Sequence, residues 1–151
     1  MSQILKENRN MLQEALRFHQ TGNLTEASII YNRILEKDPD NIDANSLLGT
    51  LNLQTGNFEV ACIFLQNALA LKPDNALAHN NLGSAFQASG RLEEAIGKYN
   101  QAIVLKPDYD EAYYNLGNAL QAMGRYDEAI ANYKRAIVHK PDDSDTHSNL
   151  G

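Results

Sequence analysis

The chain has 151 residues, with 13 basic and 19 acidic side chains and a formal net charge of -6. This balance, without any cluster of Lys and Arg, argues against a general nucleic-acid-binding surface. Charged residues interrupt the first twenty positions. We therefore expect no secretory signal and no membrane anchor there, and a cytoplasmic protein. The lone Cys62 excludes an intramolecular disulfide and is expected to be a small buried side chain.

The chain begins with a pattern typical of two helices joined by a short turn. Apolar residues at helical spacing between Ile4 and Gln20 predict a first helix, which Thr21–Asn23 interrupt. Ala27, Tyr31 and Ile34 then recur on one face of a second helix. A proline closes the hairpin, because its ring disfavours helical geometry in the preceding residue.

This pattern recurs every 34 residues. Four series of residues keep the same spacing: Pro39, Pro73, Pro107 and Pro141; Gly22, Gly56, Gly90 and Gly124; Ala27, Ala61, Ala95 and Ala129; Gly49, Gly83, Gly117 and Gly151. Such a period is typical of a solenoid, in which neighbouring repeats build the core together. We predict one all-α domain over residues 1–151, with repeats at 8–41, 42–75, 76–109 and 110–143, and the start of a truncated fifth repeat at 144–151.

The fourth repeat indicates how the helices of a pair pack. Its two apolar stripes are Tyr113, Leu116, Gly117 and Leu120 on the first helix, and Ala129, Tyr133 and Ala136 on the second. Glycine inside a helix costs about 1 kcal/mol relative to alanine, so the recurrence of Gly117 predicts a close approach by a neighbour. We expect that neighbour to be a small residue of the second helix. Gly124 suits the left-handed residue that ends a helix.

The repeat resembles the tetratricopeptide repeat. The matching residues are Leu116-Gly117 in the first helix, Ala129 and Ala136 in the second, and the closing Pro141. The first repeat departs from the pattern, with Glu14-Ala15 in place of Leu-Gly, as suits a terminal repeat with one neighbour. The resemblance implies a right-handed superhelix of antiparallel helix pairs, whose first helices line a concave groove that binds an extended peptide or a partner's helix.

The resemblance also implies which residues line this groove. The third and fourth repeats contribute Leu77, Asn80, Asn81, Ser84 and Gln87, and Glu111, Tyr114, Asn115, Asn118 and Gln121, with Asn149 beyond them. The first two repeats have Arg9, Leu12, Gln13, Leu16 and His19, and Asp43, Ser46, Leu47, Thr50 and Leu53 at these positions. The groove is therefore expected to be polar but scarcely charged.

Two branches of the family sharpen this expectation. Modules that grip acidic chaperone tails use Lys and Arg at groove positions that hold Asn80 and Tyr114 here, so that binding mode is disfavoured. The repeats of O-linked N-acetylglucosamine transferases carry an asparagine ladder, which Asn81, Asn115 and Asn149 resemble. A side-chain amide donates to and accepts from a peptide backbone, so an asparagine ladder can bind a peptide independently of the peptide's side chains. The same asparagine is also common in repeats that bind no peptide. Leu47 interrupts the ladder, which favours a groove restricted to the C-terminal repeats.

No residue pattern indicates catalysis. The four histidines lack the spacing of a metal pair on one helix, and His79 takes a packing position of the repeat. Glu93-Glu94 and Asp127-Glu128 begin second helices, where acidic side chains complement the helix dipole. Tyr31, Tyr99 and Tyr133 share one repeat position and are expected in the core. We therefore expect no enzyme, no cofactor and no metal.

The leading hypothesis is a non-catalytic module that binds a protein or an extended peptide in its groove, with no nucleic-acid or membrane partner. One alternative is that these repeats present substrates to a larger glycosyltransferase or other transferase. A second alternative is self-assembly as a homo-oligomer, because a repeat that stops at Gly151 leaves an uncapped C-terminal face with Ile130, Tyr133 and Ile137.

Overall fold

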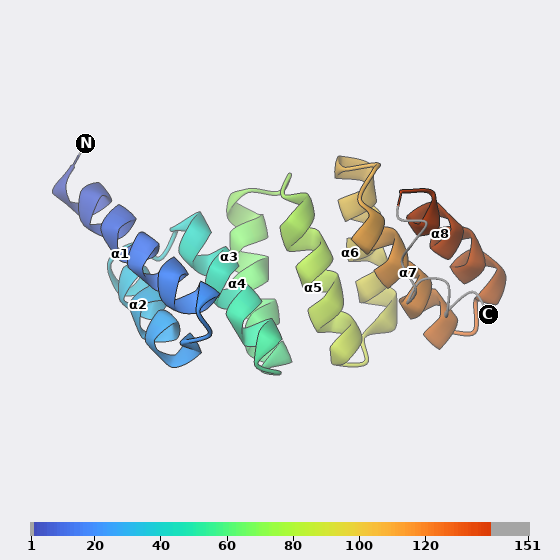
Figure 1. Ribbon diagram of the computed structural model, residues 1–151, viewed down its shortest axis with the longest axis horizontal. Helices are drawn as coiled ribbons and strands as arrows, with labels where there is room; N and C mark the ends of the chain where they lie inside the picture. Colours follow the sequence, from blue (N-terminus) through green and yellow to red (C-terminus); the bar gives the residue numbers. More distant parts are fainter. Residues whose placement is uncertain (1, 140–151) are drawn as a thin grey trace. The chain divides into compact units, whose positions relative to one another are not determined.

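The computed structural model describes residues 2–139, a range that contains eight α-helices and no β-strand (Figure 1). The helices are α1 (Gln3–Gln20), α2 (Leu24–Lys37), α3 (Ile42–Gln54), α4 (Phe58–Leu71), α5 (Ala76–Ala88), α6 (Leu92–Leu105), α7 (Asp110–Ala122) and α8 (Tyr126–His139). The predicted all-α class and the alternation of first and second helices are confirmed. Pro141 and the expected fifth repeat at 144–151 lie outside the described residues.

The chain divides into two compact units, Met1–Pro73 and Asp74–Gly151. The first unit contains α1–α4 and the second contains α5–α8, so each unit holds two helix pairs. Within each unit the two helices of a pair contact each other, and the second helix of one pair contacts the first helix of the next. The expectation of a single domain over residues 1–151 stays a prediction.

A glycine with positive φ lies in each turn between the helices of a pair. Gly22, Gly56, Gly90 and Gly124 have φ values of 84°, 83°, 81° and 78°. In the last of these turns the backbone N–H of Arg125 donates to the carbonyl oxygen of Leu120, at 2.9 Å. This bond reaches back over the helix end, as in a Schellman motif, and the predicted left-handed role of Gly124 is confirmed.

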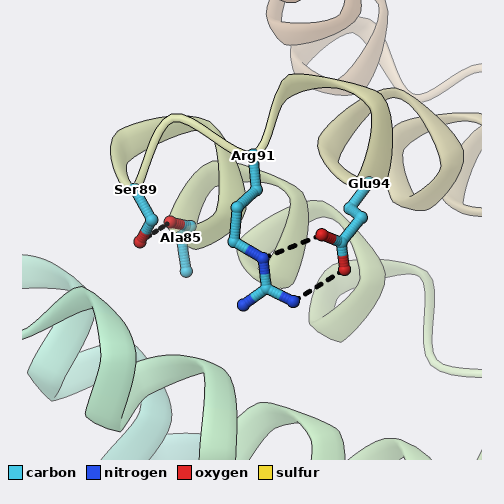
Figure 2. A network of polar contacts seen from close by, with 4 residues as sticks. All are labelled: Ala85, Ser89, Arg91 and Glu94. Carbon is cyan, nitrogen blue, oxygen red and sulfur yellow. Dashed lines mark hydrogen bonds and ion pairs between the residues drawn. The ribbon is translucent and has the colours of Figure 1, made fainter.

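The turn between α5 and α6 is held by side chains as well (Figure 2). Ser89 Oγ donates to the carbonyl oxygen of Ala85 at 2.9 Å. The Arg91 guanidinium donates twice to Glu94, at 2.8 Å from Nε and 2.7 Å from Nη2. The hydrogen bond from Arg91 lowers the pKa of the Glu94 carboxyl. Both side chains are exposed, so the pair orders the turn and contributes little stability.

The glycines inside the first helices lie against large side chains of the second helices. A Cβ atom placed on Gly117 would lie 2.6 Å from Cε1 of Tyr133, and one on Gly83 would lie 2.6 Å from Cε1 of Tyr99. The predicted close approach is confirmed, but the expectation of a small partner residue is wrong. The aromatic ring itself occupies the space that the missing side chain leaves.

The outer face of α1 is polar where later repeats are apolar. Glu14 is exposed, whereas the residues at its position in the other repeats, Leu48, Leu82 and Leu116, are buried. The departure of the first repeat from the Leu-Gly pattern therefore places a charge on a solvated surface of α1.

The expected burial of Cys62 and His79 is confirmed. Cys62 is 3% exposed, and His79 is 6% exposed at the position that Tyr113 takes in the fourth repeat.

Over the described part of the chain, each helix is too short or too polar to cross a membrane.

The contact between Gly117 and Tyr133 predicts the effect of adding one methyl group. Gly117→Ala should lower the free energy of unfolding by about 1 to 2 kcal/mol, because overpacking outweighs the better helix propensity of alanine. Gly97→Ala is the matched control, since a Cβ atom at this helical glycine meets nothing within 4 Å. The control should be neutral or stabilising. Urea unfolding measures both, and equal stabilisation by the two changes would contradict the packing role.

Candidate functional site

The predicted groove residues of the third and fourth repeats lie on α5 and α7, two helices that contact each other within the second unit. We call their accessible part the α5–α7 face. It consists of Leu77, Asn81, Ser84, Gln87, Glu111, Tyr114, Asn115, Asn118 and Gln121. Leu77, Glu111 and Gln121 are exposed, and the other six side chains are half-buried. Asn149, the last predicted groove residue, lies outside the described residues.

Asn80 does not belong to this face, although the family resemblance placed it in the groove. Its side chain is 0% exposed, and its Oδ1 accepts a hydrogen bond from Asn115 Nδ2 at 3.1 Å. The bond joins α5 to α7, so the ladder residue Asn115 contributes to the packing of neighbouring repeats. Leu12 and Leu47, the equivalent residues of the first unit, pack against the core cluster there.

Tyrosine hydroxyls from the second helices reach the α5–α7 face and bind its amides. The Tyr99 hydroxyl donates to Gln87 Oε1 at 2.7 Å. The Tyr133 hydroxyl lies 2.6 Å from Asn118 Oδ1 and 2.8 Å from Gln121 Oε1. Each of these tyrosines is 1% exposed, so the amides are held from inside the protein.

The sequence contains a signal for these hydrogen-bonded pairs, which apolar periodicity alone does not reveal. The tyrosine lies twelve residues after a polar partner in three repeats: Tyr31 after His19, Tyr99 after Gln87 and Tyr133 after Gln121. The second repeat has Leu65 after Leu53 at the same two positions. Where the second helix has tyrosine at this position, the first helix has a polar residue twelve positions earlier. Where the second helix has leucine, the first helix has leucine as well. This matching is expected for two side chains in contact.

Burial and one nearby carboxylate set the electrostatics of the face. Burial raises the pKa of Tyr99 to about 12, with a smaller rise from the negative charge of Glu111 and an opposing effect of the Ser84 hydroxyl. Burial, followed by the charge of Glu111, also raises the pKa of Tyr109. Glu111 is the single charged residue of the α5–α7 face. The face therefore has hydrogen-bonding groups and a weak negative potential.

Tyr114 adds an aromatic surface to the face. Its ring lies against that of Tyr133, with the centroids 5.9 Å apart and the planes inclined at 50°. The contact holds the half-buried ring of Tyr114 beside the amides that Tyr133 binds.

Of the residues expected on the C-terminal face for self-assembly, Ile130 is exposed, whereas Tyr133 is not. Ile130 is 40% exposed, whereas Ile96 at the same repeat position is 8% exposed. Tyr133 was expected on this face, but it is 1% exposed because its ring fills the space at Gly117. It is therefore not available to a second copy.

The described residues contain no group of three or more His, Cys, Asp or Glu side chains placed to hold a metal ion. His19 is engaged through both ring nitrogens, with Nδ1 3.0 Å from the Tyr31 hydroxyl and Nε2 2.7 Å from Gln54 Oε1. His147 lies outside the described residues.

Comparisons with known proteins agree with this architecture. A model described as TPR repeat matches residues 54–90 and 85–124, and a model described as tetratricopeptide repeat matches residues 110–143. No curated protein sequence matches the chain.

Solved structures provide further similarity. Two structures of MamA are 29% and 27% identical, with TM-scores of 0.85 and 0.88, over 90% and 95% of this chain and 80% and 78% of theirs. A mutant O-GlcNAc transferase from Thermobaculum terrenum is 29% identical, with a TM-score of 0.85, over 92% of this chain. The present chain spans 27% of that transferase.

Stacked helix pairs with a turn glycine in each repeat define a helical-repeat protein of the kind that serves in protein interactions. The chain belongs to the tetratricopeptide repeat family, with repeats that resemble those of an O-GlcNAc transferase. Both matching models describe repeats rather than a catalytic domain.

The raised pKa of Tyr99 predicts a loss of stability at alkaline pH. The pKa is about 12 in the fold against 10.0 for the free side chain, so the fold favours the neutral phenol. The resulting stabilisation is fully present below pH 10.0 and is lost as the pH rises through about 12. Urea unfolding across this range should show a smaller loss for Tyr99→Phe than for the wild-type chain. An identical pH dependence of both proteins would contradict the prediction.

The bond between Asn115 and Asn80 predicts that the ladder residue has a structural role. Asn115→Ala removes the donor to a buried carbonyl and should lower the free energy of unfolding by about 1 to 2 kcal/mol. The control is Asn100→Ala, at an exposed position of α6, which should leave stability unchanged. Thermal or urea unfolding measures the difference. Indistinguishable variants would show that the bond between Asn80 and Asn115 does not stabilise the second unit.

Proposed function

We propose that this protein binds an extended peptide segment of a partner protein on the α5–α7 face. The main support for this proposal is the high proportion of Asn and Gln side chains on the α5–α7 face. Five of the nine residues of the face are Asn or Gln: Asn81, Gln87, Asn115, Asn118 and Gln121. A carboxamide both donates and accepts, so a row of them complements the alternating N–H and C=O groups of an extended backbone.

The charge of the face supports a peptide of low acidity. Glu111 is its single charged residue, and no Lys or Arg is present to pair with carboxylates. An acidic peptide would bury its charges beside Glu111 without a basic partner, which is unfavourable. The exposed side chain of Leu77 and the half-buried ring of Tyr114 provide apolar contact at the two helices.

The likeness to the O-GlcNAc transferase favours a second candidate function. The similar region is only 27% of that chain, so the comparison concerns repeats within a longer enzyme. On this proposal the same face presents a protein substrate to a transferase, and peptide binding is again the first step. The two candidates therefore use the same surface and differ only in whether a transfer reaction occurs after the peptide has bound.

Peptide selection tests the proposed function. A random pool of twelve-residue peptides is displayed and selected against the wild-type chain, and the affinity of a selected peptide is measured by fluorescence anisotropy. Leu77→Ala combined with Gln121→Ala should weaken binding about tenfold, because an apolar contact and a hydrogen bond are lost. The Tyr133 hydroxyl keeps Asn118 as a partner in this variant, so the fold is preserved.

The matched control is Leu105→Ala combined with Gln101→Ala, which makes the same changes at exposed positions of α6. The control should bind like wild type. If both double variants bind equally weakly, or if no peptide is selected at all, the α5–α7 face is not a peptide site.

A further inference from the structure

The Tyr99 hydroxyl determines which end of the Gln87 carboxamide is free. The hydroxyl donates to Oε1 at 2.7 Å, a length typical of a strong O–H···O bond. A carboxamide has one carbonyl acceptor and one NH2 donor group. The carbonyl is therefore used inside the protein, and Nε2 has no protein partner among the described residues.

The core holds this arrangement in place. Tyr99 is 1% exposed, and its ring lies where a Cβ atom on Gly83 would approach within 2.6 Å. Ser84 Oγ lies 3.4 Å from the same hydroxyl oxygen. Because the ring cannot shift without disturbing the helix pair, the position of its hydroxyl is fixed, and the orientation of Gln87 follows from it.

Gln121, the equivalent glutamine of the fourth repeat, has a different hydrogen-bonding environment. The Tyr133 hydroxyl lies within hydrogen-bond distance of both Asn118 Oδ1 and Gln121 Oε1. One phenolic hydrogen serves one acceptor at a time, so Asn118 and Gln121, at similar distances, share the Tyr133 hydroxyl. Gln87 Oε1 is instead clearly the nearer acceptor of the Tyr99 hydroxyl, at 2.7 Å against 3.4 Å for Ser84 Oγ.

We propose that Gln87 is a specificity-determining donor, which Tyr99 orients to bind an uncharged backbone carbonyl of the partner segment. The inference rests on the proposed function and adds the chemistry recognised at this point of the face. A carboxylate would also accept from Nε2, but Glu111 already makes the α5–α7 face negative, and none of its nine residues is a Lys or Arg that would compensate a second negative charge. The partner segment therefore presents a peptide carbonyl, and not an acidic side chain, at Gln87.

A single substitution tests the NH2 donor of Gln87 while keeping an oxygen acceptor at this position. Gln87→Glu keeps an oxygen acceptor for the Tyr99 hydroxyl and replaces the NH2 donor with a second acceptor. The fold should be retained, while affinity for a peptide selected on the wild-type chain should fall at least tenfold. Gln101→Glu adds the same charge on α6, and this control should bind within twofold of wild type. Equal or tighter binding by Gln87→Glu would overturn the proposal.

A second variant tests the orientation without any ligand. Tyr99→Phe keeps the ring against Gly83 and removes the hydroxyl. The side-chain NH2 resonances of Gln87, observed by 15N NMR relaxation, should report a rigid amide in wild type and a mobile one in the variant. Tyr31→Phe, the same change in the first unit, should leave Gln87 rigid.

The two measurements distinguish the inference from the proposed function. If no peptide is selected, the proposed function fails, and the relaxation data still decide whether Tyr99 orients Gln87. If a peptide binds but Tyr99→Phe leaves the Gln87 amide rigid, the orienting role of Tyr99 is wrong. Tyr99→Phe should also weaken peptide binding about fivefold, the loss expected for one poorly placed hydrogen bond. An equal loss in Tyr31→Phe would assign the effect to general destabilisation and overturn the inference.

Discussion

Each helix pair of the second unit depends on a tyrosine ring that fills the space left by a missing side chain. Gly83 and Gly117 allow Tyr99 and Tyr133 to lie directly on the neighbouring first helix. Glycine is costly inside a helix, but here it allows close packing of a large apolar surface. The same contact places the hydroxyl at the edge of the α5–α7 face. Core packing and the orientation of the surface amides are therefore consequences of one interaction.

The two units combine a common scaffold with different first-helix surfaces. Turn glycines with positive φ and the buried alanines of second helices recur in both. At the contact between neighbouring first helices, however, the first unit has Leu12 and Leu47, and the second has Asn80 and Asn115. The proposed peptide-binding surface lies on the second unit because its first helices carry the five carboxamides of the α5–α7 face.

The sequence was sufficient to predict the helices and most of the packing. Apolar periodicity and the 34-residue repeat predict the helix pairs. The role of Gly124 follows from a local backbone preference, and that of Cys62 from its preference for burial. The site was predicted less completely. Periodicity shows which face a residue occupies, but not how close the next helix lies, so the burial of Asn80 and the ring against Gly117 were missed. Hydrogen bonds of the tyrosine hydroxyls depend on that distance as well.

We propose that the core tyrosine Tyr99 orients the Gln87 amide with which this protein holds an extended partner. A crystal structure of the chain bound to a selected peptide tests this proposal directly. We expect an extended peptide along α5 and α7, with a backbone carbonyl within hydrogen-bond distance of Gln87 Nε2 and the Tyr99 hydroxyl still bonded to Oε1. A peptide bound on the second helices α6 and α8, or an acidic side chain paired with Gln87, would contradict it.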